Sequence, residues 1–536
     1  MITKIRIKNF RKLRDVTITP DPSFNLLVGD NDAGKSTVLE AITLALAGRI
    51  NGRPAGDDLD PHWFNQDAVT EYLQAWAAGK RTSPPAIEIE VFLENRQEFV
   101  KNLWGAHNSH QPTQEAAGVT FRVTPDLDYK AEIKAHLDRD TGVLPVEYYK
   151  IEWATFGDKT LTSRPRELTI ATIDARTIRS ASGIDYHLRQ ILNDYLDEAG
   201  KAQISLAFRE VKNEMATTHL TNINTELAQL DGSIDGEQNL SLAMDQSARS
   251  AWDNIVVPHV ANIPFGLAGQ GQQAVVKITL AMTREQTAKV VMIEEPENHL
   301  SHTSLNKLLH RIRTLAGAEQ QIFITTHNSF VLNRLGLEHL TLINGTEVTK
   351  LTDLTPDTVN YFRKLPGYDT LRMALAAKFV LVEGPSDELL FERFYRDAKG
   401  KRPIEDGVDV ISMRGLSLRR CLELAKALGK TCAAVRDNDG LEIADIEAGL
   451  GDLLDNTVRR LFVGHKSLGT TLEPQVITAN PDEQKLRRVL QVTDRADIST
   501  WMRNNKTEGA IRIEDSREAL NPPPYIAEAI EFISAT

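Results

Sequence analysis

Short apolar runs that end in polar clusters recur along the chain and predict buried strands. The opening IRIKNF alternates apolar and polar residues, and an apolar run at 24–28 leads into a glycine turn. Helical spacing follows at 38–46, and the next strand-like run is 87–93. The run 290–293 and the run 322–325 also end in polar residues. Open α/β sheets bind ligands at the carboxyl ends of their strands, so this pattern predicts an α/β fold with ligand sites at those turns.

Three further segments complete the pattern. Residues 48–85 are rich in Gly, Pro and Asp, which is typical of a variable stretch. Residues 184–251 are largely polar with helical apolar spacing, which predicts a helical insertion. The apolar runs 379–382 and 431–435 begin a second block in which strands and helices alternate.

Composition limits the class of protein. The chain has 536 residues, of which 41% are hydrophobic and 25% are charged, enough for about two to four domains. It lacks an apolar run of membrane-spanning length and a signal-peptide core, so we expect a cytoplasmic protein without a membrane partner. The two cysteines, Cys421 and Cys432, cannot build a four-thiolate zinc site. A net charge of −12 argues against coating nucleic acid through general basicity but allows a local basic groove.

The segment GDNDAGKS is a complete GxxxxGK[ST] phosphate-binding loop between a predicted strand and a predicted helix. Backbone N–H groups of such a turn and of the following helix cradle phosphate. Lys35 would reach the terminal phosphates of ATP, and the hydroxyl of Ser36 would bind Mg²⁺. The predicted nucleotide-binding positions of this loop are Gly29, Asn31, Gly34, Lys35, Ser36 and Thr37.

A later buried strand ends in paired carboxylates, Glu294 and Glu295. Glu294 would bind Mg²⁺ beside the nucleotide, and Glu295 would polarise the attacking water in phosphoryl transfer. A strand that ends in a charged turn is common, so this pair alone decides little. The segment 296–300 resembles the one after Walker B in ABC and SMC-like ATPases, and His327 resembles their switch histidine.

Gly269 and Gly271 precede an apolar helix at 274–282. They take the position of the signature loop of ABC-type ATPases but lack its usual Ser-Gly pair, and a plain glycine loop remains an alternative. In ABC-type ATPases this loop caps the γ-phosphate bound to the opposing protomer. The resemblance implies that Gly269 and Gly271 contact nucleotide and that two ATPase heads meet.

Two more strands end in carboxylates. Glu383 follows the first, with Asp387 four residues later, and Asp437 and Asp439 follow the second. Mg²⁺ prefers oxygen ligands, and two metal ions about 4 Å apart can clamp the oxygens of phosphodiester cleavage, so we expect two Mg²⁺ or Mn²⁺ ions. Each half alone also fits solvated turn acids, and DNDG resembles part of a calcium loop whose other ligands are absent. Together they resemble the TOPRIM fold.

An ABC-type head followed by a TOPRIM domain resembles the OLD (overcoming lysogenisation defect) family of nucleases, including the nuclease subunit of Gabija-type anti-phage systems. The resemblance implies an ATP-binding, metal-dependent DNA endonuclease of antiviral defence in which nucleotide regulates cleavage. Lys506 would stabilise charge on the phosphate beside the catalytic carboxylates. The implied metal ligands are Glu383, Asp387, Asp437, Asp439 and Glu473.

The resemblance also implies a domain organisation. Residues 1–180 and 256–370 would form the two parts of the ATPase head, 181–255 a dimerisation region, and 371–536 the TOPRIM nuclease domain. Expected partners are DNA, a second copy of the chain or a higher homo-oligomer, and a helicase-like protein.

Two other functions remain open from the sequence. A non-cutting, SMC-like repair or recombination ATPase would use the TOPRIM block only to hold DNA. A TOPRIM topoisomerase would need a reactive tyrosine, and a bacterial-type primase usually brings a zinc module that two cysteines cannot supply.

Overall fold

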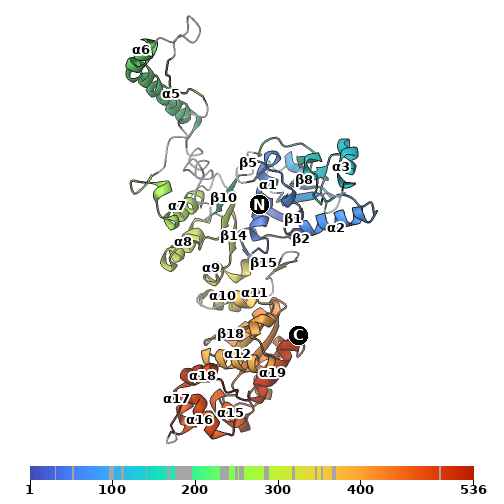
Figure 1. The fold of residues 1–536 in the computed structure, drawn as a ribbon, viewed down its shortest axis with the longest axis vertical. Helices are drawn as coiled ribbons and strands as arrows, with labels where there is room; N and C mark the ends of the chain where they lie inside the picture. The colour runs from blue at the N-terminus through green and yellow to red at the C-terminus, as the bar shows by residue number, and fades with distance from the viewer. Residues whose placement is uncertain are drawn as a thin grey trace. The chain divides into compact units, whose positions relative to one another are not determined.

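The computed structural model (Figure 1) forms two compact units, each described here by itself. The first comprises residues 1–7 and 38–324, and the second comprises 8–37 and 325–536. The units do not follow the four predicted segments, whose boundaries stay predictions. The described residues are 1–30, 32–50, 53–95, 102–109, 114–139, 142–165, 169–174, 196–229, 241–247, 252, 259–282, 289–316, 320–344, 347–351, 354–364, 370–493 and 496–535.

The first unit contains a sheet with the order β1-β6-β8-β7, in which β6, β7 and β9 each pair antiparallel with β8. Inward residues of β6 are almost fully buried, as the apolar run at 87–93 predicts. The Trp153 indole donates to the Ala45 carbonyl at 2.8 Å and ties β9 to helix α1. The bounds are β1 (Ile2–Phe10), β6 (Ile87–Leu93), β7 (Trp104–Gly105), β8 (Ala116–Pro125), β9 (Tyr149–Thr155) and α1 (Lys35–Ala47).

Helix α2 (Gln66–Ala77) lies inside the segment that the composition marks as variable. The Asn65 side chain accepts from the Ala68 N–H and caps this helix. The surrounding Gly, Pro and Asp residues are typical of loops, so the composition of this segment does not predict the helix. Helix α3 (Lys130–Leu137) and the short strands β4 (Arg49–Ile50) and β5 (Arg53–Pro54) complete this part of the unit.

The same unit also contains parallel strands. β10 (Ile170–Asp174) pairs in parallel with β13 (Val290–Glu294), which is buried along its whole length. β14 (Gln321–Thr326) is likewise buried, and its Gln321 side chain exchanges two hydrogen bonds with the backbone of Ile2. The remaining elements are α5 (Glu198–Glu214), α6 (Thr221–Gln229), α7 (Gln270–Met282), α8 (His302–Leu315), β11 (His259–Val260) and β12 (Ile263–Pro264).

The second unit begins with β2 (Leu13–Ile18) and β3 (Phe24–Val28). β3 pairs in parallel with β15 (Leu340–Asn344), which pairs antiparallel with β16 (Glu347–Lys350). Helix α9 precedes β15, α10 and α11 follow β16, and α9 contacts both of the other two helices. Their bounds are α9 (Ser329–Leu335), α10 (Pro356–Lys364) and α11 (Thr370–Leu375).

The C-terminal part of the second unit is built on a four-stranded parallel sheet with the order β18-β17-β19-β20. Val380 and Val382 face a core formed with α12 and the C-terminal helices. Phe379 and Leu381 are fully buried on the opposite face, because side chains alternate along a strand. The strands are β17 (Lys378–Val382), β18 (Val408–Ser412), β19 (Thr431–Arg436) and β20 (Arg459–Val463).

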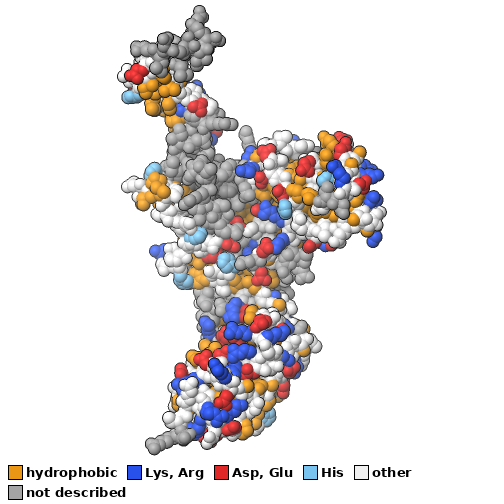
Figure 2. All heavy atoms as spheres, viewed as in Figure 1, with side chains coloured by type: hydrophobic (Ala, Val, Ile, Leu, Met, Phe, Trp, Pro, Cys, Tyr) orange, Lys and Arg blue, Asp and Glu red, His pale blue; other side chains and the backbone are white. Residues whose placement is uncertain are grey.

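Helices α12, α13 and α19 contact the strands of this sheet, and α13 contacts β19 without contributing to the core on the other face. Within the described residues, no helix has the length and apolar character needed to cross a membrane. Lys and Arg side chains alternate with Asp and Glu on the visible face of this part (Figure 2). The helices are α12 (Pro385–Lys399), α13 (Leu418–Ala427), α14 (Ile443–Leu450), α15 (Leu472–Ala479), α16 (Glu483–Leu490), α17 (Ile498–Asn504), α18 (Lys506–Asp515) and α19 (Pro524–Ala535).

Candidate functional site

Glu383 and Asp437 lie side by side because they end adjacent parallel strands. Glu383 directly follows β17 and Asp437 directly follows β19. The Asp437 N–H donates to Glu383 Oε1 at 3.3 Å. Asp387 lies in the first turn of α12, where its Oδ2 accepts from the Gly384 N–H at 3.1 Å. The strand ends and the helix start therefore bring three of the predicted metal ligands to one edge of the sheet.

The charges of these carboxylates oppose one another in a buried setting. Burial, then Glu383 and Asp387, raises the pKa of Asp437 to about 8. Burial, then Glu383, raises the pKa of Asp387 to about 6. The Asp437 side chain is almost completely buried, and its Oδ1 has no hydrogen-bond partner. A buried carboxylate oxygen without a donor is costly, so a proton or a cation at this oxygen would stabilise the group.

Glu473 and Lys506 form an ion pair next to this group. Glu473 is 5% exposed in α15, and its Oε1 lies 3.2 Å from Lys506 Nζ. The Thr471 hydroxyl donates to Glu473 Oε2 at 2.8 Å. Burial alone would lower the pKa of Lys506, but the neighbouring carboxylates, Glu473 first, raise it overall. Lys506 starts α18 and is half exposed, so its cation borders both the carboxylates and solvent.

Asp439 lies in a second, more exposed group that the sequence analysis did not recognise. Arg436 Nη2 donates to Asp439 Oδ2 at 2.9 Å, and Arg436 Nε lies 3.6 Å from Glu383 Oε1. Asp439 has φ 49°, and Asn438 supports this turn by accepting from the Gly440 N–H. Arg436 directly precedes the Asp-x-Asp pattern, and the spacing of the carboxylates does not indicate the direction of its guanidinium.

The carboxylate oxygens are ligands that a divalent cation prefers, but their positions do not form a complete coordination site. Among the described residues, no three His, Cys, Asp or Glu side chains are disposed as a ready-made ion site. The unpartnered Asp437 Oδ1 and the raised pKa values of Asp387 and Asp437 indicate an excess of negative charge that a hard cation would relieve. Small side-chain movements would be needed to complete the coordination.

Tyr525 is a further residue close to this group that the sequence analysis missed. It belongs to α19 and is 5% exposed. Burial, then the charges of the four carboxylates led by Asp437, raises the pKa of its hydroxyl. A buried, protonated hydroxyl is a poor nucleophile, which argues against Tyr525 as the reactive tyrosine of a topoisomerase.

The phosphate-binding loop has the backbone that its motif predicts. Gly34 has φ 100°, and a side chain on Gly29 would lie 2.3 Å from the Ile343 carbonyl oxygen. Lys35 is almost buried and its Nζ donates to the carbonyls of Gly29 and Asp30, each at 2.8 Å. Lys35, Ser36 and Thr37 form the first turn of α1, whereas Asn31 lies outside the described residues.

The other predicted nucleotide residues lie in the first unit, apart from His327. Glu294 is buried at the end of β13, and Glu295 has φ 43° and accepts from the Asn298 side chain at 2.8 Å. A side chain on Gly271 would lie 2.6 Å from the His299 carbonyl, so the signature-like loop packs on the segment after Walker B. Gly269 directly precedes α7, and no atom would obstruct a side chain there.

In the second unit, His327 is connected to the carboxylate site through two helices. His327 lies just before α9, which contacts α10. The Tyr361 hydroxyl of α10 accepts from the Ser417 N–H at 2.8 Å. Ser417 ends a loop whose Arg414 N–H donates to the Glu383 carbonyl at 3.1 Å. These contacts form a series that runs from α9 to the backbone of Glu383.

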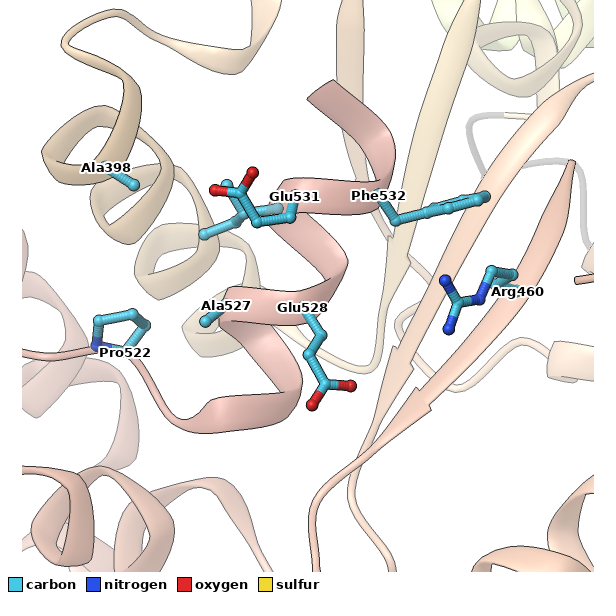
Figure 3. A pocket seen from close by; sticks show the side chains of 8 residues that line it. Ala398, Arg460, Pro522, Ala527, Glu528, Glu531 and Phe532 are labelled. Atoms are coloured by element: carbon cyan, nitrogen blue, oxygen red, sulfur yellow. The ribbon is translucent and has the colours of Figure 1, made fainter. Parts of the chain in front are cut away.

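A separate hollow of about 470 Å³ lies on the same part of the chain (Figure 3). Arg460 lies over the Phe462 and Phe532 rings, 5.0 and 5.3 Å from their centroids. None of the residues that line this hollow belongs to the carboxylate group. The lining residues are Ala398, Arg460, Pro522, Ala527, Glu528, Ile530, Glu531 and Phe532.

Comparison with known families defines the class of protein. Residues 4–146 match an AAA domain, and residues 80–332 match an AAA ATPase domain. Residues 375–439 match the overcoming lysogenization defect protein-like TOPRIM domain. The chain therefore combines AAA-type ATPase domains with an OLD-like TOPRIM domain, and the predicted α/β class and order of domains are confirmed.

Individual relatives agree with this combination. Endonuclease GajA of Bacillus cereus (strain VD045) is 20% identical over 474 residues, covering 82% of this chain and 75% of that protein. The DNA replication and repair protein RecF of Pasteurella multocida (strain Pm70) is 33% identical over 82 residues, 15% of this chain and 23% of RecF. The chain thus matches less than a quarter of RecF.

Solved structures with some likeness include ATPase heads. The SmcHead bound to the C-winged helix domain of ScpA has a TM-score of 0.35 and 13% identity, covering 66% of this chain and 98% of that one. The recombination mediator protein RecF with ATP has a TM-score of 0.32 and 12% identity, covering 66% and 99%. At these TM-scores the likeness adds nothing to the fold described above.

Proposed function

We propose that the protein is a metal-dependent DNA endonuclease whose ATPase part regulates phosphodiester cleavage. The observation that carries the proposal is the group of Glu383, Asp387 and the buried Asp437 at the carboxyl edge of the parallel sheet. The similarity to Endonuclease GajA over 82% of the chain supports endonuclease activity. DNA as the substrate and a role in antiviral defence belong to the same proposal.

In this proposal the carboxylates hold a divalent cation, Mg²⁺ or Mn²⁺. The positive charge of the cation would activate water and neutralise the charge of the phosphate. Glu383, Asp387 and Asp437 would be the central ligands, with Glu473 and Asp439 beside them. Lys506 would donate to a non-bridging phosphate oxygen and stabilise the charge that develops there. The ion pair with Glu473 holds Lys506 next to the carboxylates before DNA binds.

The ATPase part would bind ATP through the loop from Gly29 to Thr37. Lys35 would exchange its two carbonyl contacts for phosphate oxygens, while Ser36 and Glu294 would bind Mg²⁺. Glu295 would orient the attacking water, and His327 would sense the γ-phosphate. Gly269 and Gly271 would cap nucleotide on a second copy of the chain, which makes a homodimer or higher homo-oligomer part of the proposal.

ATP is proposed to restrain cutting rather than to drive it, because the signature-like loop lacks the usual Ser-Gly pair. The proposed domains are the four segments predicted from the sequence, with 181–255 as the dimerisation region. A cytoplasmic location and a helicase-like partner belong to the same proposal.

A non-cutting, SMC-like repair or recombination ATPase is the second candidate. It is favoured by the RecF match, although this match covers only 15% of the chain. Under this candidate the TOPRIM part would bind DNA without hydrolysing it. Metal-dependent cleavage separates the two functions.

The test is cleavage of supercoiled plasmid with Mg²⁺ or Mn²⁺, with and without ATP, by the wild type, Glu383→Ala and Lys35→Ala. We expect metal-dependent cutting by the wild type, loss of cutting in Glu383→Ala, and cutting by Lys35→Ala that no longer responds to ATP. Glu447→Gln is a matched control, because Glu447 is an exposed carboxylate on α14. Equal cutting by the wild type and Glu383→Ala would refute the proposed site, and Lys35→Ala that follows ATP like the wild type would refute the regulation.

A further inference from the structure

Arg436 bridges the carboxylates of Glu383 and Asp439, both of which are predicted metal ligands. Its Nη2 donates to Asp439 Oδ2 at 2.9 Å, and its Nε lies 3.6 Å from Glu383 Oε1. The same Nε donates to the Asp437 backbone carbonyl at 3.0 Å, which fixes the guanidinium against the turn. The Arg436 side chain is 23% exposed, so it is held among these groups and not extended into solvent.

The carboxylates divide into two groups according to the charge beside them. Asp387 Oδ2 accepts from the Gly384 N–H, and the buried Asp437 has an unpartnered Oδ1. Glu383 lies between the two groups, because its Oε1 accepts from the Asp437 N–H and lies 3.6 Å from Arg436 Nε. The guanidinium therefore pairs with Asp439 and Glu383, whereas the carboxylates of Asp387 and Asp437 form no ion pair with it.

We infer that Arg436 takes the place of one of the two metal ions, so that the centre binds a single divalent ion at Glu383, Asp387 and Asp437. The inference rests on the proposed metal-dependent function. It changes the predicted number of metal ions in the carboxylate site from two to one. Arg436 and the Asp437 N–H both contact Glu383 Oε1, which leaves Oε2 as the oxygen for the ion. The unpartnered Asp437 Oδ1 supplies another ligand.

The physical reason is charge. A second divalent ion between Glu383 and Asp439 would have to displace a guanidinium that already makes three contacts there. A guanidinium is always protonated, so no change of pH in the ordinary range vacates this place. Arg436 would also present its remaining N–H groups to a phosphate oxygen of DNA, as a planar donor does.

Mn²⁺ titration of the nucleotide-free, full-length chain tests the inference, with the free ion followed by electron paramagnetic resonance. The wild type should bind one tight Mn²⁺ per chain. Arg436→Gln should bind a second ion at least tenfold more tightly than the wild type does, because the vacated carboxylates of Glu383 and Asp439 lose their cation. Arg436→Lys retains the charge and should keep one ion. Arg488→Gln is the matched control, since Arg488 pairs with Glu518 on the surface and its loss should leave one ion.

Asp439→Asn provides a second variant that retains Arg436. One ion with unchanged affinity supports the inference, because Asp439 is not a ligand of that ion; loss of an ion would overturn it. Two tight ions in the wild type, or a single ion in folded Arg436→Gln, would also overturn it. Absence of any tight Mn²⁺ in the wild type contradicts both the inference and the proposed function. One ion that becomes two in Arg436→Gln, without DNA cutting by any form, supports the inference and contradicts the endonuclease alone.

Discussion

Asp437→Asn should stabilise the metal-free protein at alkaline pH although it removes a proposed ligand. The pKa of Asp437 rises from 3.8 to about 8, first through burial and then through Glu383 and Asp387. One pKa unit corresponds to about 1.4 kcal/mol. A rise of one unit, about a quarter of the rise in the pKa of Asp437, therefore already destabilises the ionised folded state by about 1.4 kcal/mol. For a part of this size that predicts a melting temperature about 3–6 °C higher in Asp437→Asn at pH 8 in EDTA.

The direction with pH follows from proton binding. Below about pH 4, Asp437 is protonated in the folded and unfolded chain, and its ionisation costs no stability. As pH rises toward 8, the unfolded chain releases the proton while the folded chain retains it, so the stability of the wild type falls. The advantage of Asp437→Asn should therefore be largest at pH 8 and should shrink toward pH 5.

The assay is thermal unfolding of the full chain in EDTA at several pH values, with hydrogen exchange of peptides from 431–443 to locate the change. Mn²⁺ should stabilise the wild type more than Asp437→Asn, because an ion that binds only the folded state shifts the equilibrium. Glu447→Gln, an exposed carboxylate on α14, is the control and should differ little at any pH. The reasoning is refuted if Asp437→Asn melts below the wild type at pH 8 in EDTA, or if its difference does not vary with pH.

Lys506, Tyr361 and Gly29 give three further predictions. Lys506→Gln should cut DNA at least tenfold more slowly than the wild type but should bind Mn²⁺ with an affinity within a factor of about three, because Lys506 pairs with Glu473 and is not a metal ligand. Single-turnover cleavage and Mn²⁺ titration check this, and an equal loss of cleavage and Mn²⁺ affinity would contradict it. Tyr361→Phe removes the hydrogen bond to the Ser417 N–H and should reduce the effect of ATP on cutting while leaving cutting without ATP unchanged; cleavage across ATP concentrations tests it, and an unaltered ATP response would be contrary to a role for the contacts from α9 to Glu383. Gly29→Ala places a carbon 2.3 Å from the Ile343 carbonyl oxygen, so nucleotide binding, measured with a fluorescent ATP analogue, should fall at least tenfold, whereas Gly56→Ala, which meets no atom within 4 Å, should bind normally.

The sequence predicts those parts of the fold whose pattern is local. The run 24–28 and the run 379–382 are buried strands, and the positions after them carry the phosphate loop and Glu383. Helix α2 was missed because its start depends on one capping residue, Asn65, within a segment whose composition is typical of loops. The composition of a segment does not show a single contact such as this cap. The start of the helix depends on one side chain that accepts a hydrogen bond from the backbone.

The carboxylate site shows the same limit at longer range. The sequence predicts that Glu383 and Asp437 each end a buried strand. The structure pairs these strands in parallel, so their carboxyl ends meet at one edge. Spacing does not predict which carboxylates keep an unopposed charge, since this depends on the direction of Arg436 and on the burial of Asp437. The Asp-x-Asp pattern alone treats Asp437 and Asp439 as equivalent ligands. Their environments differ: one is buried with an unpartnered oxygen, and the other is exposed and paired with a guanidinium. The number of metal ions therefore depends on the environment of each carboxylate, which the motif does not specify.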